Sequence, residues 1–299
     1  MQTLAEVVDT KPKHFSISHK DIRVGKVGDM VMPQLSLPLE TVLEKVRDFE
    51  VRPDDVLLCS FPKSGTHWIY RVVDMLLRGS AEFGPRGLDS AFLDLQDHGN
   101  IEQLDSPRIL GSHLPFELLP RQVKDKKTKI VYVFRHLKSV LTSGYCQVKG
   151  TQMMAGSSNQ MTMDMYADFF FTPPMAYGGW FKHLEGVTTF MNSIKDHPVF
   201  ILCYEKALMN PTQTVKDLAQ FLGIIASQEL SQAIADACSF KNQKETEEKL
   251  DPSNIIYRFY RKGDTDDWKN YITVALNERL DQMLCERAQS CPLAANYVM

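Results

Sequence analysis

The sequence predicts a single α/β domain in which a central parallel sheet is flanked by helices on both faces. Short apolar runs that suit buried strands recur at 56–61, 130–134 and 199–204, and segments with helical spacing separate them. Strands that alternate with helices are typical of parallel sheets. We find no internal repeat and no linker that divides the chain. We therefore expect an N-terminal arm at 1–38, packed on one domain that spans 39–299.

The N-terminal residues 1–38 are polar and carry several prolines, which predicts an irregular arm lying over the domain. Apolar residues from Leu39 to Phe49 then follow helical spacing, so we expect a helix before the first strand. A polar turn at 52–55 separates this helix from the strand.

The stretch Val56–Leu77 organises the rest of the chain. Val56–Phe61 has the length and apolar character of a buried strand, Pro62–Gly65 is a breaker-rich turn, and later apolar residues follow helical spacing. A strand, a tight turn and a helix start together aim free backbone N–H groups at an anion. Lys63 and Thr66 add a positive charge and a hydroxyl group. We therefore expect this P-loop-like segment to bind a phosphate-like group.

Two further strands follow this segment. The region 79–100 is rich in glycine and lacks a clear period, which predicts a loop close to the anion site. Arg108–His113 has the pattern of a short strand that ends in a polar edge. Ile130–Phe134 has the pattern of a stronger strand, which stops at Arg135 and is followed by helical spacing.

The last strand lies between two helices. Helical spacing predicts a helix over Tyr177–Ile194, and the apolar run Val199–Tyr204 predicts the strand that follows it. The next helix is expected to have Thr212 as its N-cap and to stop at Gly223.

The predicted strand ends gather polar side chains at one edge of the sheet. Ligands of open parallel sheets bind beyond the carboxyl ends of the strands. These ends carry Lys63, Thr66, His113, Arg135 and Tyr204. Strands far apart in the sequence are therefore expected to bring a cation, an imidazole and a guanidinium to one rim.

The bulk composition excludes several classes of protein. The chain is 43% hydrophobic and 24% charged and has a net charge of −3, which argues against a nucleic-acid partner. Its six cysteines are scattered without a CxxC pair, which indicates reduced thiols rather than a disulfide framework or a zinc site. No cluster of acidic residues and histidines has metal-ligand spacing, so no metal is expected. No apolar stretch approaches ~18 residues and no signal peptide is evident, so we expect a cytoplasmic protein without a membrane partner.

Four motifs occur in order along the chain: FPKSGTHW at 61–68, SHLP at 112–115, YVFRHLKSVLTSGY at 132–145 and FYRKGDTDDWKNYITVALNE at 259–278. Together they resemble motifs of the cytosolic sulfotransferase family. Its members transfer a sulfuryl group from 3′-phosphoadenosine 5′-phosphosulfate (PAPS) to a hydroxyl or an amine. The first motif resembles the family's phosphosulfate loop, PKSGTTW, and the second resembles the segment of the catalytic histidine. The third resembles the 3′-phosphate segment, and the fourth resembles the C-terminal signature.

The resemblance implies specific roles for residues of these motifs. His113 would act as the general base, because a neutral imidazole with a reference pKa of ~6.5 suits that role near neutral pH. Lys63 would stabilise the leaving oxygen, because sulfuryl transfer resembles phosphoryl transfer in its loose transition state. The residues implied to bind PAPS, or its product 3′-phosphoadenosine 5′-phosphate (PAP), are Lys63, Ser64, Gly65, Thr66, His67, Trp68, Arg135, Ser143, Tyr204, Ser239, Phe240, Arg261, Lys262 and Gly263.

Two groups within this set have different expected partners. Forked donors of Arg135 and Arg261, with the hydroxyl of Ser143, suit the 3′-phosphate that separates PAPS from an ordinary nucleotide. Trp68 and Phe240 match family positions that stack on the adenine. Trp68 could equally be a core residue of its helix, and the sequence leaves both roles open.

Two residues depart from the family pattern. His67 replaces the second threonine of PKSGTTW, so one hydroxyl contact is lost and an imidazole is gained. Gly111 stands two residues before His113, where many members have a lysine that helps to bind the sulfuryl oxygens. Losing that charge is expected to weaken transition-state stabilisation, unless His67 or another group compensates.

The acceptor is expected to be a small molecule. Phe92, Tyr145 and Phe170 are candidates for an aromatic acceptor pocket, and the resemblance implies a phenol, alcohol, steroid or amine. The loops at 79–100 and 149–174 would set the choice.

A dimer is implied by the last motif. Lys269, Thr273, Val274 and Glu278 fit the family's dimer pattern KxxxTVxxxE at every specified position. We therefore expect a homodimer.

Three alternatives to a PAPS-dependent sulfotransferase stay open. A P-loop kinase shares the strand–turn–helix start, but the chain lacks the GxxxxGK[ST] pattern that wraps phosphates and holds Mg²⁺. A PAP(S)-binding protein with weak catalysis is suggested by Gly111. A dehydratase could sulfate an alcohol transiently and then eliminate sulfate.

Overall fold

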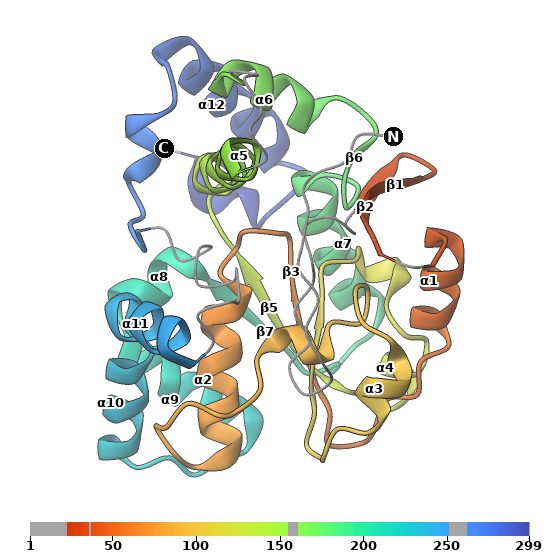
Figure 1. The fold of residues 1–299 in the computed structure, drawn as a ribbon, viewed down its shortest axis with the longest axis vertical. Helices are drawn as coiled ribbons and strands as arrows, with labels where there is room; N and C mark the ends of the chain where they lie inside the picture. Colours follow the sequence, from red (N-terminus) through yellow and green to blue (C-terminus); the bar gives the residue numbers. More distant parts are fainter. Residues whose placement is uncertain (1–22, 36, 155–160, 251–261, 299) are drawn as a thin grey trace.

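The computed structural model describes residues 23–35, 37–154, 161–250 and 262–298. Its central feature is a four-stranded sheet with all strands parallel and the order β4-β3-β5-β7 (Figure 1). The strands are β3 (Val56–Ser60), β4 (Ile109–Ser112), β5 (Lys129–Phe134) and β7 (Val199–Cys203). The predicted α/β fold class is therefore confirmed, and the four strands lie where the apolar runs predicted them.

Helices cover both faces of this sheet because its strands are apolar on both sides. Val56 and Leu58 of β3 pack into one hydrophobic cluster, whereas Leu57 and Cys59 pack into another on the opposite face. The first cluster includes residues of the helices α2 (Thr66–Arg78), α9 (Pro211–Leu222) and α10 (Gln228–Ala237). The second includes residues of α1 (Leu39–Arg47), α5 (Leu137–Met154), α7 (Trp180–Ser193) and α12 (Val274–Ala288).

Shorter elements complete the described part of the fold. Figure 1 shows α5, α6 and α12 beyond the carboxyl ends of the central strands. The remaining helices are α3 (His98–Glu102), α4 (Gln122–Asp125), α6 (Met163–Phe171), α8 (Tyr204–Met209) and α11 (Phe240–Leu250). The 3₁₀ helices are η1 (Leu88–Ala91), η2 (Phe116–Leu118), η4 (Asp267–Asn270) and η5 (Ala294–Tyr297).

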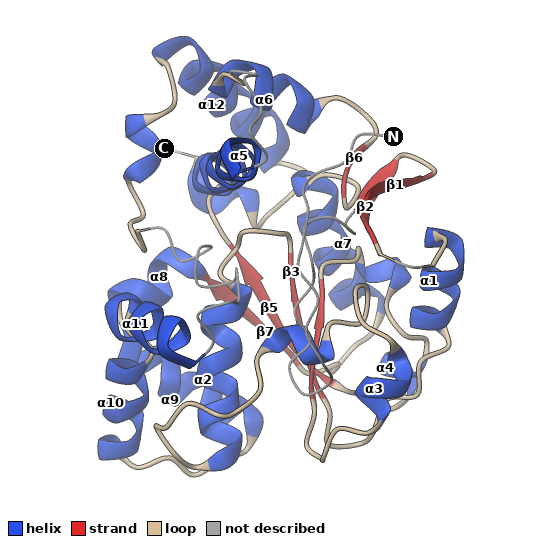
Figure 2. Ribbon diagram, in the orientation of Figure 1, coloured by secondary structure: helices blue, strands red, loops and turns tan. Residues whose placement is uncertain are grey.

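The N-terminal region differs from the irregular arm that we expected. β1 (Arg23–Val27) and β2 (Met30–Gln34) form an antiparallel hairpin, and β2 also pairs with β6 (Met175–Ala176) (Figure 2). Met30 and Met32 alternate with less buried neighbours and enter the core, which holds the hairpin on the domain. This short period-two pattern indicated a strand, but the neighbouring prolines concealed it. Residues 1–22 lie outside the described part.

Three smaller expectations need correction. The region 79–100, predicted as a loop, contains η1 and the start of α3. The region 149–174, also predicted as a loop, is helical up to Met154 and again in α6. Thr212 is not the N-cap of α9. Asn210 takes that position and a proline begins the helix, whereas Gly223 ends it in the left-handed conformation as predicted.

All six cysteines lie in the described part, and none forms a disulfide. Within the described ranges, none of the helices combines the length and the apolar character that crossing a bilayer requires.

Candidate active site

The turn between β3 and α2 forms a cradle of backbone groups at a helix N-terminus. Lys63 and Gly65 adopt positive φ angles of 70° and 100°. Only glycine suits position 65, because an added Cβ would lie 2.5 Å from the ring of Tyr204. The first N–H groups of a helix have no partner within the helix, so the start of α2 suits an anion.

Three buried hydroxyl groups belong to this turn and the residues beside it. Thr66 and Ser60 share a buried hydrogen bond between their hydroxyl oxygens at 2.6 Å. The Oγ atom of Ser64 is buried and has no hydrogen-bond partner in the part of the chain that the structure describes. A buried hydroxyl without a partner is unusual in a folded protein and is consistent with a ligand-binding role.

Tyr204 connects the cradle to the end of β5. The guanidinium of Arg135 lies over the Tyr204 ring at 4.4 Å and donates a hydrogen bond to the carbonyl oxygen of Lys63 at 3.2 Å. Trp68 packs edge-on against the same ring, with centroids 5.4 Å apart. The Nε atom of Arg135 is buried without a hydrogen-bond partner among the described residues. The structure therefore brings together four of the predicted site residues from three separate segments.

His113 lies immediately after β4, beside the strand that leads into the cradle. Its Nδ1 is 2.7 Å from the carbonyl oxygen of Ser60. Because a carbonyl oxygen can only accept a hydrogen bond, Nδ1 must carry the hydrogen, and the lone pair of the neutral ring is on Nε2. The rings of Phe92 and Tyr177 lie 4.7 and 5.5 Å away. Burial lowers the pKa of His113 to about 3, so the ring is neutral near pH 7.

Asp94 is a buried acidic residue next to His113 that the sequence analysis did not single out. Its Oδ1 accepts the backbone N–H of His113 at 3.2 Å. Burial raises the pKa of Asp94 to about 6, and hydrogen bonds from Ser112 and Tyr177 oppose this rise. The sequence did carry a signal for Asp94, because it is a single acidic residue inside the apolar run AFLDL at 91–95. Acidic residues are rarely buried without a partner.

Gly111 has no space for a larger side chain in this structure. An added Cβ would lie 2.8 Å from Leu88 and 2.9 Å from Phe92. Both residues are buried, and Phe92 also forms an isolated parallel bridge with Gly111. The position that holds a lysine in many family members is therefore closed by two apolar side chains.

His67 lies in the first turn of α2, partly buried. Burial lowers its pKa to about 3, and the positive charges of Lys63 and Arg71 contribute to the shift. Its carbonyl oxygen accepts a hydrogen bond from Gln243 of α11 at 3.4 Å. The neutral ring still has one N–H group that can donate to an anion.

The second expected phosphate clamp is described only in part, because Arg261 lies outside the described residues. Lys262 forms an ion pair with the buried Asp267 at 2.7 Å. Gly263 lies against the ring of Phe240, which is 2.5 Å from the position of an added Cβ. Ser239 directly precedes Phe240, the first residue of α11. Phe240 and Gly263 are thus in close contact.

Ser143 lies in α5, two turns after Arg135, and is partly buried. The same helix contacts the segment after the clamp, because Ser139 donates a hydrogen bond to the carbonyl oxygen of Thr265 at 3.1 Å. α5 thereby joins the end of β5 to the C-terminal motif.

The three candidate acceptor residues are all buried, at different distances from the cradle. Phe92 contacts His113 directly. Phe170 packs edge-on against Phe61, the residue that follows β3, with ring centroids 5.9 Å apart. Tyr145 is more remote and contacts Tyr166, which in turn contacts Phe170.

The expected dimer residues lie at the start of α12. Thr273 is its N-cap and accepts the backbone N–H of Leu276 at 3.2 Å. Val274 is 76% exposed, and Glu278 is exposed one turn later. Lys269 forms an ion pair with Asp266 at 2.9 Å.

Within residues 23–35, 37–154, 161–250 and 262–298, no group of three or more histidine, cysteine or acidic side chains is arranged to hold a metal ion.

Comparisons with known proteins show the family to which the chain belongs. The sequence profile of the sulfotransferase domain matches residues 53–292. Sulfotransferase 1A1 of Rattus norvegicus is 32% identical over 263 residues, covering 82% of this chain and 88% of that protein. Sulfotransferase 1B1 of Canis lupus familiaris is 34% identical over 259 residues, covering 80% and 84%.

Solved structures share the fold. The crystal structure of mouse sulfotransferase SULT7A1 complexed with PAP has a TM-score of 0.74 and 26% sequence identity, covering 91% of this chain and 97% of that chain. Retinol dehydratase in complex with androsterone and inactive cofactor PAP has a TM-score of 0.70 at 16% identity, covering 89% and 90%, which shows similarity of fold alone.

Proposed function

Because the chain belongs to the sulfotransferase family, we propose that it transfers a sulfuryl group from PAPS to a hydroxyl or amine of a small hydrophobic acceptor, with His113 as general base. The observation that carries this proposal is the hydrogen bond between Nδ1 of His113 and the carbonyl oxygen of Ser60. It leaves the Nε2 lone pair available on a neutral imidazole beside the cradle. A general base needs this protonation state and this position.

PAPS is the cofactor, and PAP is its product. When bound, PAPS supplies the sulfuryl group. The described residues fit it, because Ser64 Oγ and Arg135 Nε are buried polar atoms without partners among them. The residues proposed to hold the phosphosulfate are Lys63, Ser64, Gly65, Thr66 and His67. Those proposed for the 3′-phosphate and adenosine are Trp68, Arg135, Ser143, Tyr204, Ser239, Phe240, Arg261, Lys262 and Gly263.

The residues of the chain have distinct tasks in the proposed reaction. His113 accepts the proton of the acceptor group at Nε2. Lys63 and the N–H groups at the start of α2 stabilise the negative charge that develops on the leaving oxygen. The Ser60 carbonyl stabilises the imidazolium, because it accepts the Nδ1 hydrogen throughout.

The acceptor side is apolar and aromatic. The rings of Phe92 and Tyr177 both contact His113, and Phe92 closes the space beside Gly111. Flat rings pack favourably against such side chains, so a phenol or another hydroxylated aromatic suits the site. Tyr145 and Phe170 are proposed to shape the far part of the pocket.

A catalytically weak PAP-binding protein is a second candidate function. One observation favours it: Gly111 contributes no charge, and Leu88 and Phe92 close that position. Without a cation there, the sulfuryl oxygens would depend on Lys63 and His67.

We further propose that the enzyme is cytoplasmic and acts as a homodimer through the Lys269–Glu278 segment. Its relatives include sulfotransferases of the 1A and 1B groups, and all six cysteines are free thiols. The exposure of Val274 leaves that side chain available to a second copy.

Thermal shift and labelled-sulfate transfer test the proposed function together. PAP is expected to stabilise the protein more than ADP or ATP does, with or without Mg²⁺, and labelled sulfate is expected to appear on a phenol. A preference for ATP–Mg²⁺ would contradict the proposal. Binding of PAP without transfer to any phenol, alcohol or amine would favour the binding protein, and an unsaturated, sulfate-free product would favour a dehydratase.

A further inference from the structure

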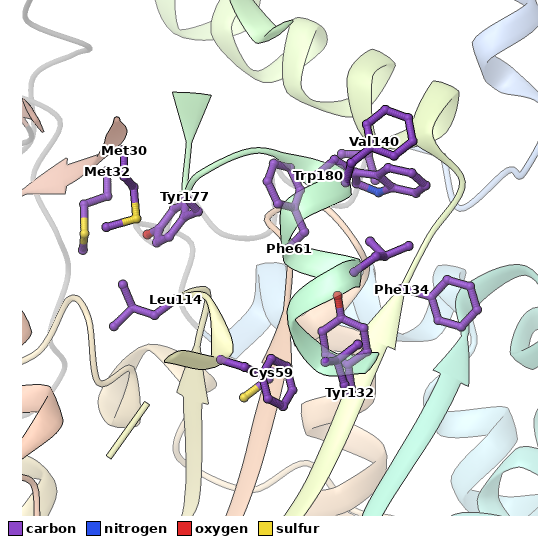
Figure 3. Close-up of a cluster of buried hydrophobic side chains, with 14 of the residues drawn as sticks. Met30, Met32, Cys59, Phe61, Leu114, Tyr132, Phe134, Val140, Tyr177 and Trp180 are labelled. Carbon is purple, nitrogen blue, oxygen red and sulfur yellow. The ribbon is translucent and has the colours of Figure 1, made fainter. Parts of the chain in front are cut away.

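His183 is a fully buried histidine in α7 that has no task in the proposed reaction. It lies on the inner face of the helix with Trp180 and Leu184. Tyr132 of β5 stacks on it, with ring centroids 5.6 Å apart and planes at 17°. Figure 3 shows Tyr132 in the same buried cluster as Phe61 and Trp180. A histidine in such a cluster needs polar partners, because burying a polar ring without hydrogen bonds is costly.

Both ring nitrogens of His183 have such partners. Nε2 lies 3.1 Å from the backbone carbonyl oxygen of His113, and Nδ1 lies 2.8 Å from the hydroxyl oxygen of Tyr132. The carbonyl can only accept, so Nε2 carries the hydrogen. Burial lowers the pKa of His183 to about 4, so the ring is neutral near pH 7 and Nδ1 accepts from the tyrosine hydroxyl. The carbonyl of His113 thereby sets the Nε2–H tautomer of His183, and the Tyr132 hydroxyl donates to the Nδ1 lone pair that this tautomer leaves.

The backbone of His113 needs these side-chain partners. The residue lies one position beyond the end of β4, so its N–H and C=O groups are outside the β-ladder. Asp94 accepts the N–H, and His183 donates to the C=O. Buried backbone groups are nearly always hydrogen-bonded, so each of these bonds restricts the orientation of the residue.

We propose that His183, hydrogen-bonded by Tyr132, is a positioning residue that fixes the backbone of His113 and thereby orients its imidazole. This inference rests on the proposed role of His113 as base. The backbone N–H and C=O groups of His113 are both hydrogen-bonded, and Nδ1 of its imidazole donates to the carbonyl oxygen of Ser60. Without the His183 donor, the carbonyl of residue 113 loses its partner and the peptide can rotate toward another one. The ring then leaves Ser60, and Nε2 loses its alignment with the acceptor.

Two substitutions at position 183 separate donation from packing. His183→Phe keeps an aromatic ring against Tyr132 but removes both polar atoms. His183→Gln keeps an amide N–H that can reach the carbonyl of His113. The matched control is Leu184→Val, which removes one methylene at the neighbouring buried position of the same helix and no hydrogen bond.

The expected kinetic result is a fall in kcat without a matching loss of cofactor binding. We expect His183→Phe to lower kcat by about tenfold or more, because small displacements of catalytic groups have effects of this size. PAP affinity is expected to stay within about twofold, since the cradle is untouched. His183→Gln is expected to recover most of the rate. An unchanged kcat in His183→Phe, or an equal fall in Leu184→Val, would overturn the proposal.

A spectroscopic readout distinguishes failure of this inference from failure of the proposed function. Long-range ¹H–¹⁵N spectra of histidine-labelled protein identify which ring nitrogen carries hydrogen. We expect wild-type His113 as the Nδ1–H tautomer and His183 as the Nε2–H tautomer, assigned with His113→Ala and His183→Phe. His183→Phe is expected to lose the Nδ1–H signal of His113, and persistence of this signal would overturn the inference. Retained transfer in His113→Ala would instead contradict the proposed function.

Tyr132→Phe provides the test if His183→Phe does not fold. It keeps the stacked ring and removes only the hydroxyl that donates to Nδ1 of His183. A weaker Nδ1–H signal of His113 and a lower kcat are expected, because His183 loses one of its two hydrogen-bond partners. An unchanged His113 signal with an unchanged kcat would overturn the proposal.

Discussion

The Nδ1 atom of His113 and the carbonyl oxygen of Ser60 lie 2.7 Å apart, although 53 positions separate the two residues in the sequence. The register of the sheet accounts for this contact. Cys59 of β3 is paired with Ser112 of β4, so the next residue of each strand lies at the same edge. β3 then continues into the turn that carries Lys63. The strand pairing that builds the fold therefore also places the proposed base beside the proposed anion site.

Buried neutral histidines are expected to make stability depend on pH. The pKa values of His67 and His113 are lowered to about 3, whereas an unfolded histidine has a pKa of about 6.5. The unfolded chain therefore binds more protons as pH falls below about 6.5, and the free energy of unfolding decreases. Asp94 has the opposite effect on the free energy of unfolding. Its pKa is raised to about 6 in the folded protein, so its contribution to stability is present at lower pH and is lost as pH rises through that value.

His67→Thr tests this dependence. The free energy of unfolding is measured with urea at about pH 7.5 and about pH 5.5. On acidification it is expected to fall by about 1 kcal/mol less in the variant than in wild type. An equal loss in both proteins would show that His67 takes up its proton equally in the folded and unfolded states.

Arg135→Ala is expected to weaken the binding of PAP by about 10- to 100-fold, because a charge-assisted hydrogen bond contributes about 1.5–3 kcal/mol. Adenosine 5′-phosphosulfate, which lacks the 3′-phosphate, is expected to lose much less affinity. Calorimetric titration measures both. Arg78→Ala is the control, because Arg78 pairs with Asp74 in the last turn of α2. Equal losses for the two nucleotides would count against a 3′-phosphate role for Arg135.

Gly111→Lys is expected to destabilise the protein by about 1–3 kcal/mol, as overpacked cores do. Its Cβ would collide with Leu88 and Phe92, so the restored charge is not expected to raise the rate of transfer. Thermal unfolding and kcat measure the two effects. Gly150→Ala in α5 is the control, since no atom lies within 4 Å of its added Cβ. A faster and equally stable Gly111→Lys variant would show that the position is open in solution.

Val274→Glu is expected to shift the proposed homodimer toward monomer, because it places a charge on an exposed apolar side chain at the centre of the dimer pattern. Sedimentation velocity measures the change. Ile225→Glu alters a fully exposed residue elsewhere and provides the control. An unchanged sedimentation profile for Val274→Glu would reject this interface.

Much of the fold could be predicted from the sequence because the central strands carry local signals. Continuous apolar runs such as Ile130–Phe134 occur where both faces of a strand are buried. The β1–β2 hairpin was missed because a proline within β2 concealed its period-two pattern, and because the pairing of β2 with β6 is distant in sequence. Local patterns carry little information about such tertiary pairings.

The candidate site was predictable to the extent that its residues belong to contiguous motifs. Lys63, His113 and Arg135 follow strands, so their common edge could be inferred from the topology. Asp94 and His183 act on the backbone of His113 from other elements, and their partners emerge only when the chain is folded.

Single-turnover transfer of labelled sulfate from PAPS to a phenol, measured for wild type and His113→Ala, tests the central claim most directly. We expect the variant to lose transfer by about 100-fold or more, the usual scale of general-base catalysis, while its affinity for PAP is retained. Transfer at the wild-type rate by His113→Ala would contradict the assignment of His113 as base.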